Sequence, residues 1–122
     1  MKFLVKKPIP GFENISEVEL VKIDENIAEL RDSDGKVLFS LINPFTLREY
    51  SFDIPADVKA LLEINENSNI EVYNNLVAKE PISESIVNFK APFLFNLDNN
   101  TCAQVIIENE EYGKIGDFLN KD

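Results

Sequence analysis

The 122-residue chain has no histidine, few glycines and one cysteine, Cys102. Without histidine it lacks the commonest general base, the usual activator of a nucleophile and a preferred zinc ligand. A single cysteine excludes an internal disulfide and a cysteine-rich metal site, and its place in an apolar strand pattern predicts a buried, inert thiol. No glycine-rich loop for a phosphate or a dinucleotide is present. We therefore expect no catalytic residue, no metal and no cofactor.

Long hydrophobic runs are also absent. A helix that crosses a bilayer needs about 20 predominantly apolar residues, and no segment of the chain approaches that length. The first ten residues, MKFLVKKPIP, place only three consecutive apolar residues before Lys6, too few for the core of a signal peptide. We expect a cytoplasmic protein that does not enter a membrane.

Positive charge is scarce, with 12 Lys and Arg against 22 Asp and Glu and a net charge of −10. Solubility alone calls for a magnitude of about 2–8. Such a surface repels nucleic-acid phosphate and anionic lipid and attracts basic proteins. We therefore expect no direct nucleic-acid binding and allow for a basic protein partner. The many acid pairs are better explained as solvated surface than as the carboxylates of a glycosidase.

Short apolar segments separated by turn residues dominate the chain and predict strands. We expect them at residues 2–6, 17–24, 27–31, 37–42, 50–54, 70–79, 86–90, 93–97 and 101–108. The run IVNFKAPFLFN is predicted to form two strands, 86–90 and 93–97, because Pro92 between them cannot donate to a strand ladder. The phenylalanines of this run, Phe89, Phe93 and Phe95, are expected in the core.

One segment, 55–63, predicts a short helix. Pro55 suits a first helical position, Asp57 suits the positive end of the helix dipole, and the apolar side chains share one face. With about seven to nine short strands, the chain predicts a single all-β domain spanning 1–122, a small antiparallel sandwich or pseudo-barrel. The turn at 32–35 is expected to be a hairpin turn rather than a calcium loop, because the later ligands are missing.

Two features offer a surface for a protein partner. Pro44 and Phe45 end a central strand, and Phe45 is either a lid over the core or a contact residue; burial of large apolar side chains favours the lid. Glu108, Glu110 and Glu111 follow the last long strand and suit a basic partner. The alternative for these acids is a solvated strand end.

Four segments occur in an order that resembles the flagellar assembly factor family, FliW. They are IPGFE at 9–13, LRDSDGKVLFSLINPF at 30–45, NFKAPFLFN at 88–96 and AQVIIENEEY at 103–112. The resemblance implies a small cytoplasmic all-β protein without catalysis. It also adds Asn88, Lys90 and Pro92 to the candidate binding residues, although a fold requirement for the kink explains the recurrence of this segment equally well.

The resemblance further implies two alternative partners. Members of the family bind newly made flagellin and, once flagellin is exported, the translational regulator CsrA. Binding antagonises the RNA binding of CsrA and so couples flagellin synthesis to flagellum assembly. From the residues alone two alternatives stay open, an acidic mimic of nucleic acid and a generic protein-interaction module. We expect a monomer when the chain is free.

Overall fold

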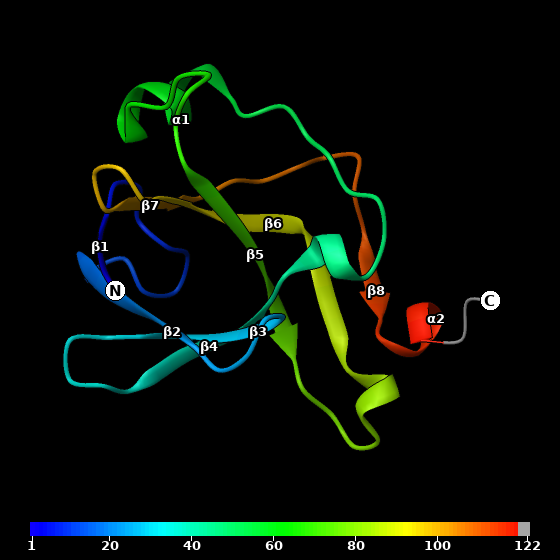
Figure 1. Cartoon of the computed structure of the whole chain (residues 1–122). Coiled ribbons are helices and arrows are strands. Elements are labelled where there is room, and N and C mark those ends of the chain that lie inside the picture. Colours follow the sequence, from blue (N-terminus) through cyan, green and yellow to red (C-terminus); the bar gives the residue numbers. More distant parts are fainter. Residues whose placement is uncertain (120–122) are drawn as a thin grey trace.

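The computed structural model describes residues 1–119, and within them seven strands close into a barrel that an eighth strand extends (Figure 1). The order around the barrel is β5-β4-β3-β2-β1-β7-β6, and β6 pairs again with β5, while β8 adds to β6. The strands are β1 (Lys2–Val5), β2 (Glu17–Lys22), β3 (Ile27–Arg31), β4 (Val37–Ile42), β5 (Ile70–Val77), β6 (Ile86–Asn96), β7 (Thr101–Gln104) and β8 (Tyr112–Lys114). The helical segments are η1 (Pro44–Thr46), α1 (Ala56–Leu62), η2 (Ile82–Glu84) and α2 (Gly116–Leu119).

The predicted all-β fold and the short helix near 55–63 are confirmed, whereas the second short helix, α2, was not predicted. Within residues 1–119 the sheet forms a barrel rather than a sandwich. All the strand pairs among residues 1–119 are antiparallel except β1 with β7. There the first strand of the chain lies parallel to a strand near its end, with Leu4 opposite Thr101 and Val5 opposite Cys102. This pairing of the two ends of the sequence closes the barrel.

The core has two parts that share β6. Phe93 and Phe95 belong to the cluster of side chains that includes Phe3 of β1, while Leu94 belongs to a second cluster with Leu62 of α1. Because successive side chains of a strand point to opposite faces, β6 is buried on both sides here. The expected burial of Phe89, Phe93 and Phe95 is confirmed.

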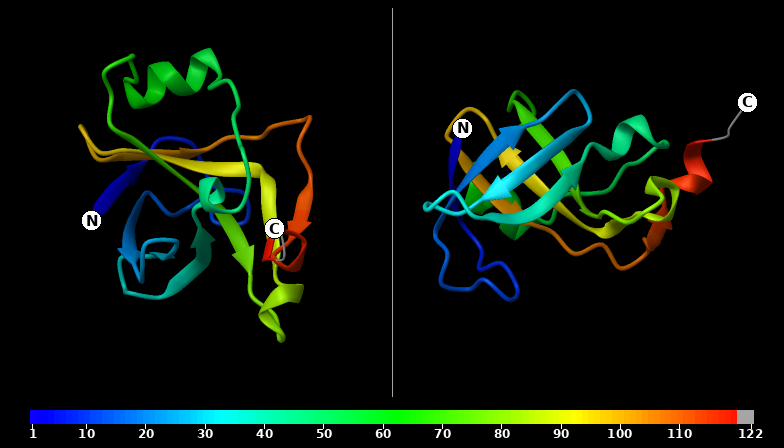
Figure 2. Two further views of the ribbon diagram at one scale, coloured as in Figure 1. Left: turned by 45° about the vertical axis from the view of Figure 1, so that its right-hand side comes forward. Right: turned by 90° about the horizontal axis from the view of Figure 1, so that it is seen from below.

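Helix α1 covers one end of the barrel (Figure 2). Val58 and Leu62 are buried, whereas Leu61, which was predicted on the same face, is partly exposed. Pro55 precedes the helix as its N-cap instead of occupying the first helical position. Asp57 lies in the first turn, as predicted.

The prediction of two strands at 86–90 and 93–97 was wrong, because β6 runs through Pro92 as one bent strand of 11 residues (Figure 2). The bend coincides with a change of neighbour: residues 86–88 pair with β8, and residues 93–96 pair with β7. The register against β5 also shifts between Tyr73 and Asn75. The missing N–H of Pro92 falls within this shift, so the proline interrupts no regular ladder.

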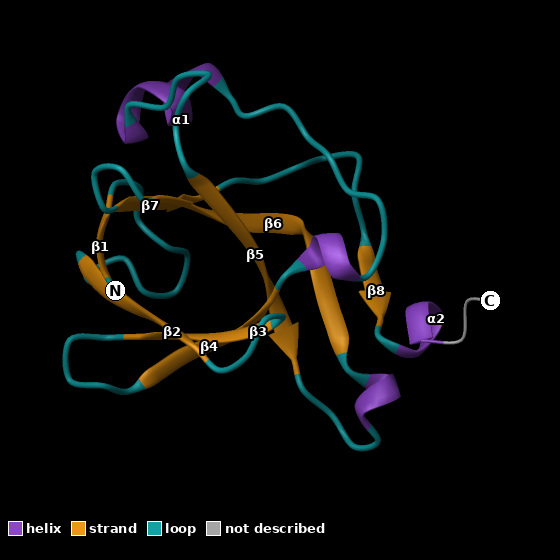
Figure 3. Ribbon diagram, viewed as in Figure 1, coloured by secondary structure: helices purple, strands orange, loops and turns teal. Residues whose placement is uncertain are grey.

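The prediction of an edge strand at 50–54 was also wrong, because these residues form an extended loop (Figure 3). Their period-2 pattern has another cause: Tyr50 is buried, and Phe52 and Ile54 pack against the core cluster beneath α1. The apolar alternation therefore reflects side-chain packing rather than backbone pairing.

The thiol of Cys102 provides a direct test of the barrel interior. Its side chain is 1% exposed, and burial raises the pKa of the thiol to about 12. Because the thiolate is the reactive form, we expect the native protein to resist a chromogenic disulfide reagent at pH 8. The denatured chain should react with one equivalent. Equal labelling rates with and without denaturant would contradict the buried position.

Candidate partner-binding surface

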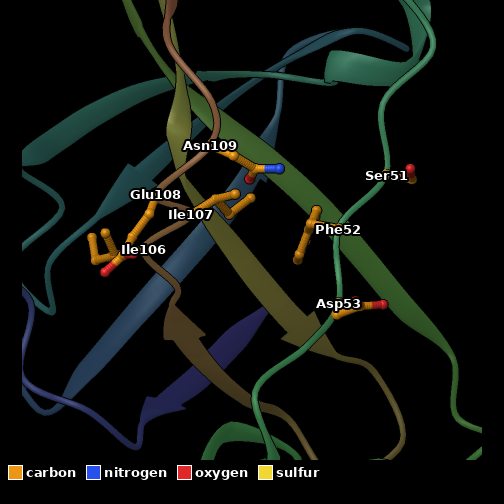
Figure 4. Close-up of a pocket in the computed structure, with 7 residues that line it drawn as sticks. All are labelled: Ser51, Phe52, Asp53, Ile106, Ile107, Glu108 and Asn109. Atoms are coloured by element: carbon orange, nitrogen blue, oxygen red, sulfur yellow. The ribbon is translucent and has the colours of Figure 1, made fainter.

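An open groove of about 510 Å³ lies between two extended segments that are far apart in the sequence (Figure 4). One wall comes from the loop between η1 and α1, and the other from the loop between β7 and β8 (Figure 3). The lining residues are Ser51, Phe52, Asp53, Ile106, Ile107, Glu108 and Asn109. The groove thus includes one of the acids predicted as a binding residue.

The segment after β7 is attached to β6 by its own donors. Val105 donates its backbone N–H to the carbonyl of Pro92 at 2.9 Å, and Ile107 donates to the carbonyl of Lys90 at 2.6 Å. Strand β6 does not donate these hydrogen bonds back to the segment. Pro92 has no N–H, and the N–H of Lys90 donates to Oδ1 of Asn88 at 3.0 Å. The ladder is therefore half complete, which explains why the predicted strand at 101–108 is regular only to Gln104.

The residues predicted from the resemblance lie behind this segment rather than in the groove. Pro92 is buried, and Asn88 and Lys90 are half-buried. None of the three lines the groove wall. The backbone carbonyls of Lys90 and Pro92 accept the hydrogen bonds that hold the segment carrying Glu108.

The three predicted acids differ in their surroundings. Glu110 forms an ion pair with Arg48, with 2.7 Å between Oε2 and Nη2 and side chains that are 17% and 31% exposed. Arg48 also lies 4.6 Å from the ring centroid of Phe89, which is a cation–π contact. Glu108 and Glu111 are exposed. Glu110 therefore joins the two loops of the groove, while its neighbours are available to a partner.

Pro44 and Phe45 lie at the start of the loop that forms the other wall. Pro44 is buried in η1, and Oδ1 of Asn43 accepts the N–H of Phe45 at 3.0 Å. The ring of Phe45 is 51% exposed, with its centroid 5.9 Å from that of the buried Tyr50. Phe45 thus covers Tyr50 on one side and faces solvent on the other. Its position is compatible both with a lid over the core and with a contact residue for a partner.

A buried hydrogen-bond network lies under the bend of β6. Asn74, which is fully buried, donates from Nδ2 to the carbonyl of Asn88 at 2.8 Å and to the hydroxyl of Tyr50 at 3.3 Å. The Tyr50 hydroxyl donates to the carbonyl of Phe89 at 2.6 Å. Burial raises the pKa of the Tyr50 phenol, which keeps it a donor. These side chains satisfy the carbonyls that the register shift removes from the ladder.

Arg48, Phe52 and Asp53 are parts of this surface that the sequence did not single out. The available signal was Arg48, a cation beside a loop aromatic in a strongly acidic chain. Without the fold this signal does not indicate a binding surface. No group of three or more His, Cys, Asp or Glu side chains among residues 1–119 is arranged to hold a metal ion. Within the same residues no helix is long and apolar enough to cross a membrane.

Known proteins similar to the chain agree with one another. The family model described as "FliW protein" matches residues 2–115. The flagellar assembly factor FliW of Sulfurimonas denitrificans is 47% identical over 126 residues, which covers 99% of this chain and 100% of that protein. FliW 2 of Wolinella succinogenes is 41% identical and covers 100% of this chain and 95% of its own, and FliW 1 is 45% identical and covers 92% and 88%.

A solved structure has the same fold. The crystal structure of the flagellar assembly factor FliW matches with a TM-score of 0.83 at 24% identity, over 93% of this chain and 82% of that chain. The closed barrel and the short helix described above therefore belong to a fold that is already known from experiment.

Proposed function

The chain belongs to the FliW family of flagellar assembly factors, and from this premise we propose that it is a non-enzymatic cytoplasmic regulator that binds flagellin and, alternatively, CsrA. When flagellin is scarce in the cytoplasm, the free protein binds CsrA and weakens its hold on RNA. When flagellin is abundant, it occupies the protein instead. Flagellin synthesis then follows the progress of assembly. Family membership is the observation that carries this proposal.

The charge of the chain gives the antagonism a physical basis. A protein with a net charge of −10, docked on a basic RNA-binding protein, adds negative potential that decays over about 8 Å at physiological salt. RNA phosphates near the docking site are then repelled even if the groove for RNA stays open. An acidic mimic of nucleic acid would instead fill that groove.

The partners are tested by a pull-down. The tagged full chain is returned to the cytoplasm of its native cell, and bound proteins are identified by mass spectrometry. We expect flagellin and CsrA, with CsrA depleted from the bound fraction when purified flagellin is added. Recovery of neither protein would overturn the proposal. Recovery of both, without competition, would overturn the switch between them.

The mode of antagonism is tested by titrating RNA into the complex with CsrA at several salt concentrations. We expect inhibition to weaken as salt rises, and a ternary complex to form at high salt, because screening shortens the range of the repulsion. Inhibition that does not change with salt would contradict long-range repulsion. Strict competition between RNA and the protein would indicate the mimic.

Reversal of the two exposed acids should slow association with CsrA. The double substitution Glu108→Lys and Glu111→Lys is expected to lower the association rate about tenfold at low salt, because complementary charge acts mainly on that rate. Glu110 is left unchanged since it pairs with Arg48. The control is Glu25→Lys with Asp34→Lys, which makes the same change of charge at exposed turn residues. Stopped-flow measurements that give equal rates for both variants would exclude this surface.

A further inference from the structure

The geometry points to the free edge of β8 as a site where an extended segment of a partner protein is added to the sheet as a further strand. Strand β8 ends the order of strands and pairs only with β6. It lies beside the bent half of β6, outside the closed barrel (Figure 1). Within residues 1–119 it is the one strand whose second edge has no neighbour.

The pairing of β8 with β6 determines which backbone groups face this edge. Ile115 donates its N–H to the carbonyl of Ser85 at 2.9 Å. Along an antiparallel strand, residues that bond to the neighbour alternate with residues that point away from it. Gly113, two residues before Ile115, is therefore bonded to β6, and the N–H and carbonyl groups of Tyr112 and Lys114 point outward. None of these four outward groups has a hydrogen-bond partner among residues 1–119.

Helix α2 follows β8 but contacts a face of the sheet, not this edge. A Cβ on Gly113 would point into that face, 2.8 Å from the ring of Phe89 and 3.3 Å from the ring of Phe118 in α2. A lysine often protects an edge strand from pairing. Here the ammonium of Lys114 lies 3.4 Å from the carboxylate of Glu84 in η2, which directly precedes β6. The lysine is thus drawn toward β6, and the outward groups stay accessible.

The side chains beside the edge offer apolar contact. An open hollow of about 290 Å³ lies along β8, lined by Ile86, Tyr112, Gly113, Lys114 and Asp117. Ile86 is directly opposite Lys114, so both side chains lie on one face of the sheet. Tyr112, two residues from Lys114, lies on the same face, and its side chain is 64% exposed. An apolar side chain of an added strand can therefore contact Tyr112 and enter the hollow.

Charge decides between a second copy and a different protein. Two copies that each carry a net charge of −10 repel one another. The residues that flank β8 are also acidic, because Glu111 precedes it and Asp117 follows it, and both are exposed. The nearby cation Lys114 is paired with Glu84. The occupant is therefore a partner segment that is apolar at its centre and basic at its ends.

This inference deepens the proposed function and rests on it only for the existence of a protein partner. The two can fail separately. A synthetic peptide tests the edge without flagellin or CsrA, and the pull-down tests the partners without reference to the edge.

The probe is a fluorescein-labelled peptide of three valines between two runs of three lysines, with blocked ends, added to the full chain. We expect a saturable rise in anisotropy at physiological salt. A second peptide carries a methyl group on each valine nitrogen, which removes the central donors and keeps the side chains and the charge. It should bind at least about tenfold more weakly, since backbone bonds supply affinity in strand addition. Equal binding of the two peptides would overturn the inference.

Substitutions of Tyr112 locate the site. Tyr112→Pro removes an outward N–H without removing an observed hydrogen bond, and proline is tolerated where the N–H of an edge strand faces solvent. It should bind the peptide about tenfold more weakly than Tyr112→Ala, which loses the same ring and keeps the N–H. Phe45→Ala removes an exposed ring elsewhere and should retain the binding. Equal binding by the two Tyr112 variants would overturn the site.

Reversal of the flanking acids tests the basic ends of the occupant. Glu111→Lys with Asp117→Lys should weaken the peptide about tenfold or more, because it replaces attraction with repulsion at both ends of β8. The control pair Glu25→Lys with Asp34→Lys makes the same change of charge at exposed turns and should weaken it less. Equal binding by the two pairs would overturn the assignment of a basic partner to this edge.

Hydrogen exchange tests the edge in the unsubstituted protein. In the free chain the amide of Gly113 should exchange more slowly than those of Tyr112 and Lys114, because only the Gly113 amide is bonded to β6. The peptide should slow exchange at Tyr112 and Lys114 at least about tenfold. Protection confined to other parts of the barrel would overturn the inference. So would sedimentation of the free chain as a dimer that the peptide does not dissociate, because a second copy would then occupy the edge.

Discussion

Replacement of Phe95 with alanine is expected to lower the free energy of unfolding by about 3–5 kcal/mol. The ring is fully buried, with its centroid 5.0 Å from that of Phe3 and 6.1 Å from that of Tyr73 in edge-on arrangements. The cavity left by the ring lies inside a closed barrel, where hydrogen bonds on both sides of the strands resist collapse. The loss is a large part of the roughly 5–15 kcal/mol of a typical domain.

Urea denaturation followed by tyrosine fluorescence or circular dichroism measures this loss. The matched control is Phe45→Ala, the same chemical change at a side chain that is half exposed. It should cost less than about 1 kcal/mol, because much of its apolar area is already in water. Similar losses for the two variants would contradict the assignment of Phe95 to the barrel interior.

The second large effect is expected from Asn74→Asp, a change of nearly the same shape. A carboxylate cannot donate to the carbonyl of Asn88 or to the hydroxyl of Tyr50, the two acceptors that Asn74 now serves. Burial of an unpaired charge and loss of both bonds should cost about 3 kcal/mol or more at neutral pH. The folded protein reduces this cost by holding the new acid protonated.

The pH dependence of Asn74→Asp follows from that protonation. Burial raises the pKa of the carboxyl in the folded state above its value of about 3.9 in the unfolded chain. The unfolded state therefore loses its proton first, and the variant loses stability relative to the unsubstituted protein as pH rises between the two pKa values. Denaturation at pH 5 and pH 8 measures the difference. Asn67→Asp, at an exposed position, is the control, and a loss that does not change with pH would contradict a buried carboxyl.

Local patterns in the sequence predicted which side chains are buried more reliably than which backbones pair. The alternation of Tyr50, Phe52 and Ile54 correctly predicted apolar side chains that face the core, but these residues pack against the core cluster without a partner strand. At Pro92 the general rule against proline in strands predicted a break. The strand continues because its neighbour changes at that point, and this change depends on β8, far along the chain.

The candidate surface was also predictable only in part, because local patterns indicate which side chains are exposed but not which distant residues they contact. The exposure of Glu108 and Glu111 follows from their place after an apolar strand. Glu110 has the same local sequence context, yet it pairs with Arg48, 62 residues away. That pairing, and the groove itself, arise only when the loop after η1 and the loop after β7 are brought together by the closed barrel.

The parallel pairing of β1 with β7 has a consequence for folding during synthesis on the ribosome. The first strand to emerge can pair at once with β2, but its other neighbour begins at Thr101. At a synthesis rate of about 5–20 residues per second, roughly 5–20 s separate the two strands. During this interval β1 keeps one open edge, and the slow, long-range step of folding waits until β7 has been made. The barrel of this chain therefore stays incomplete until residues 101–104 have left the ribosome.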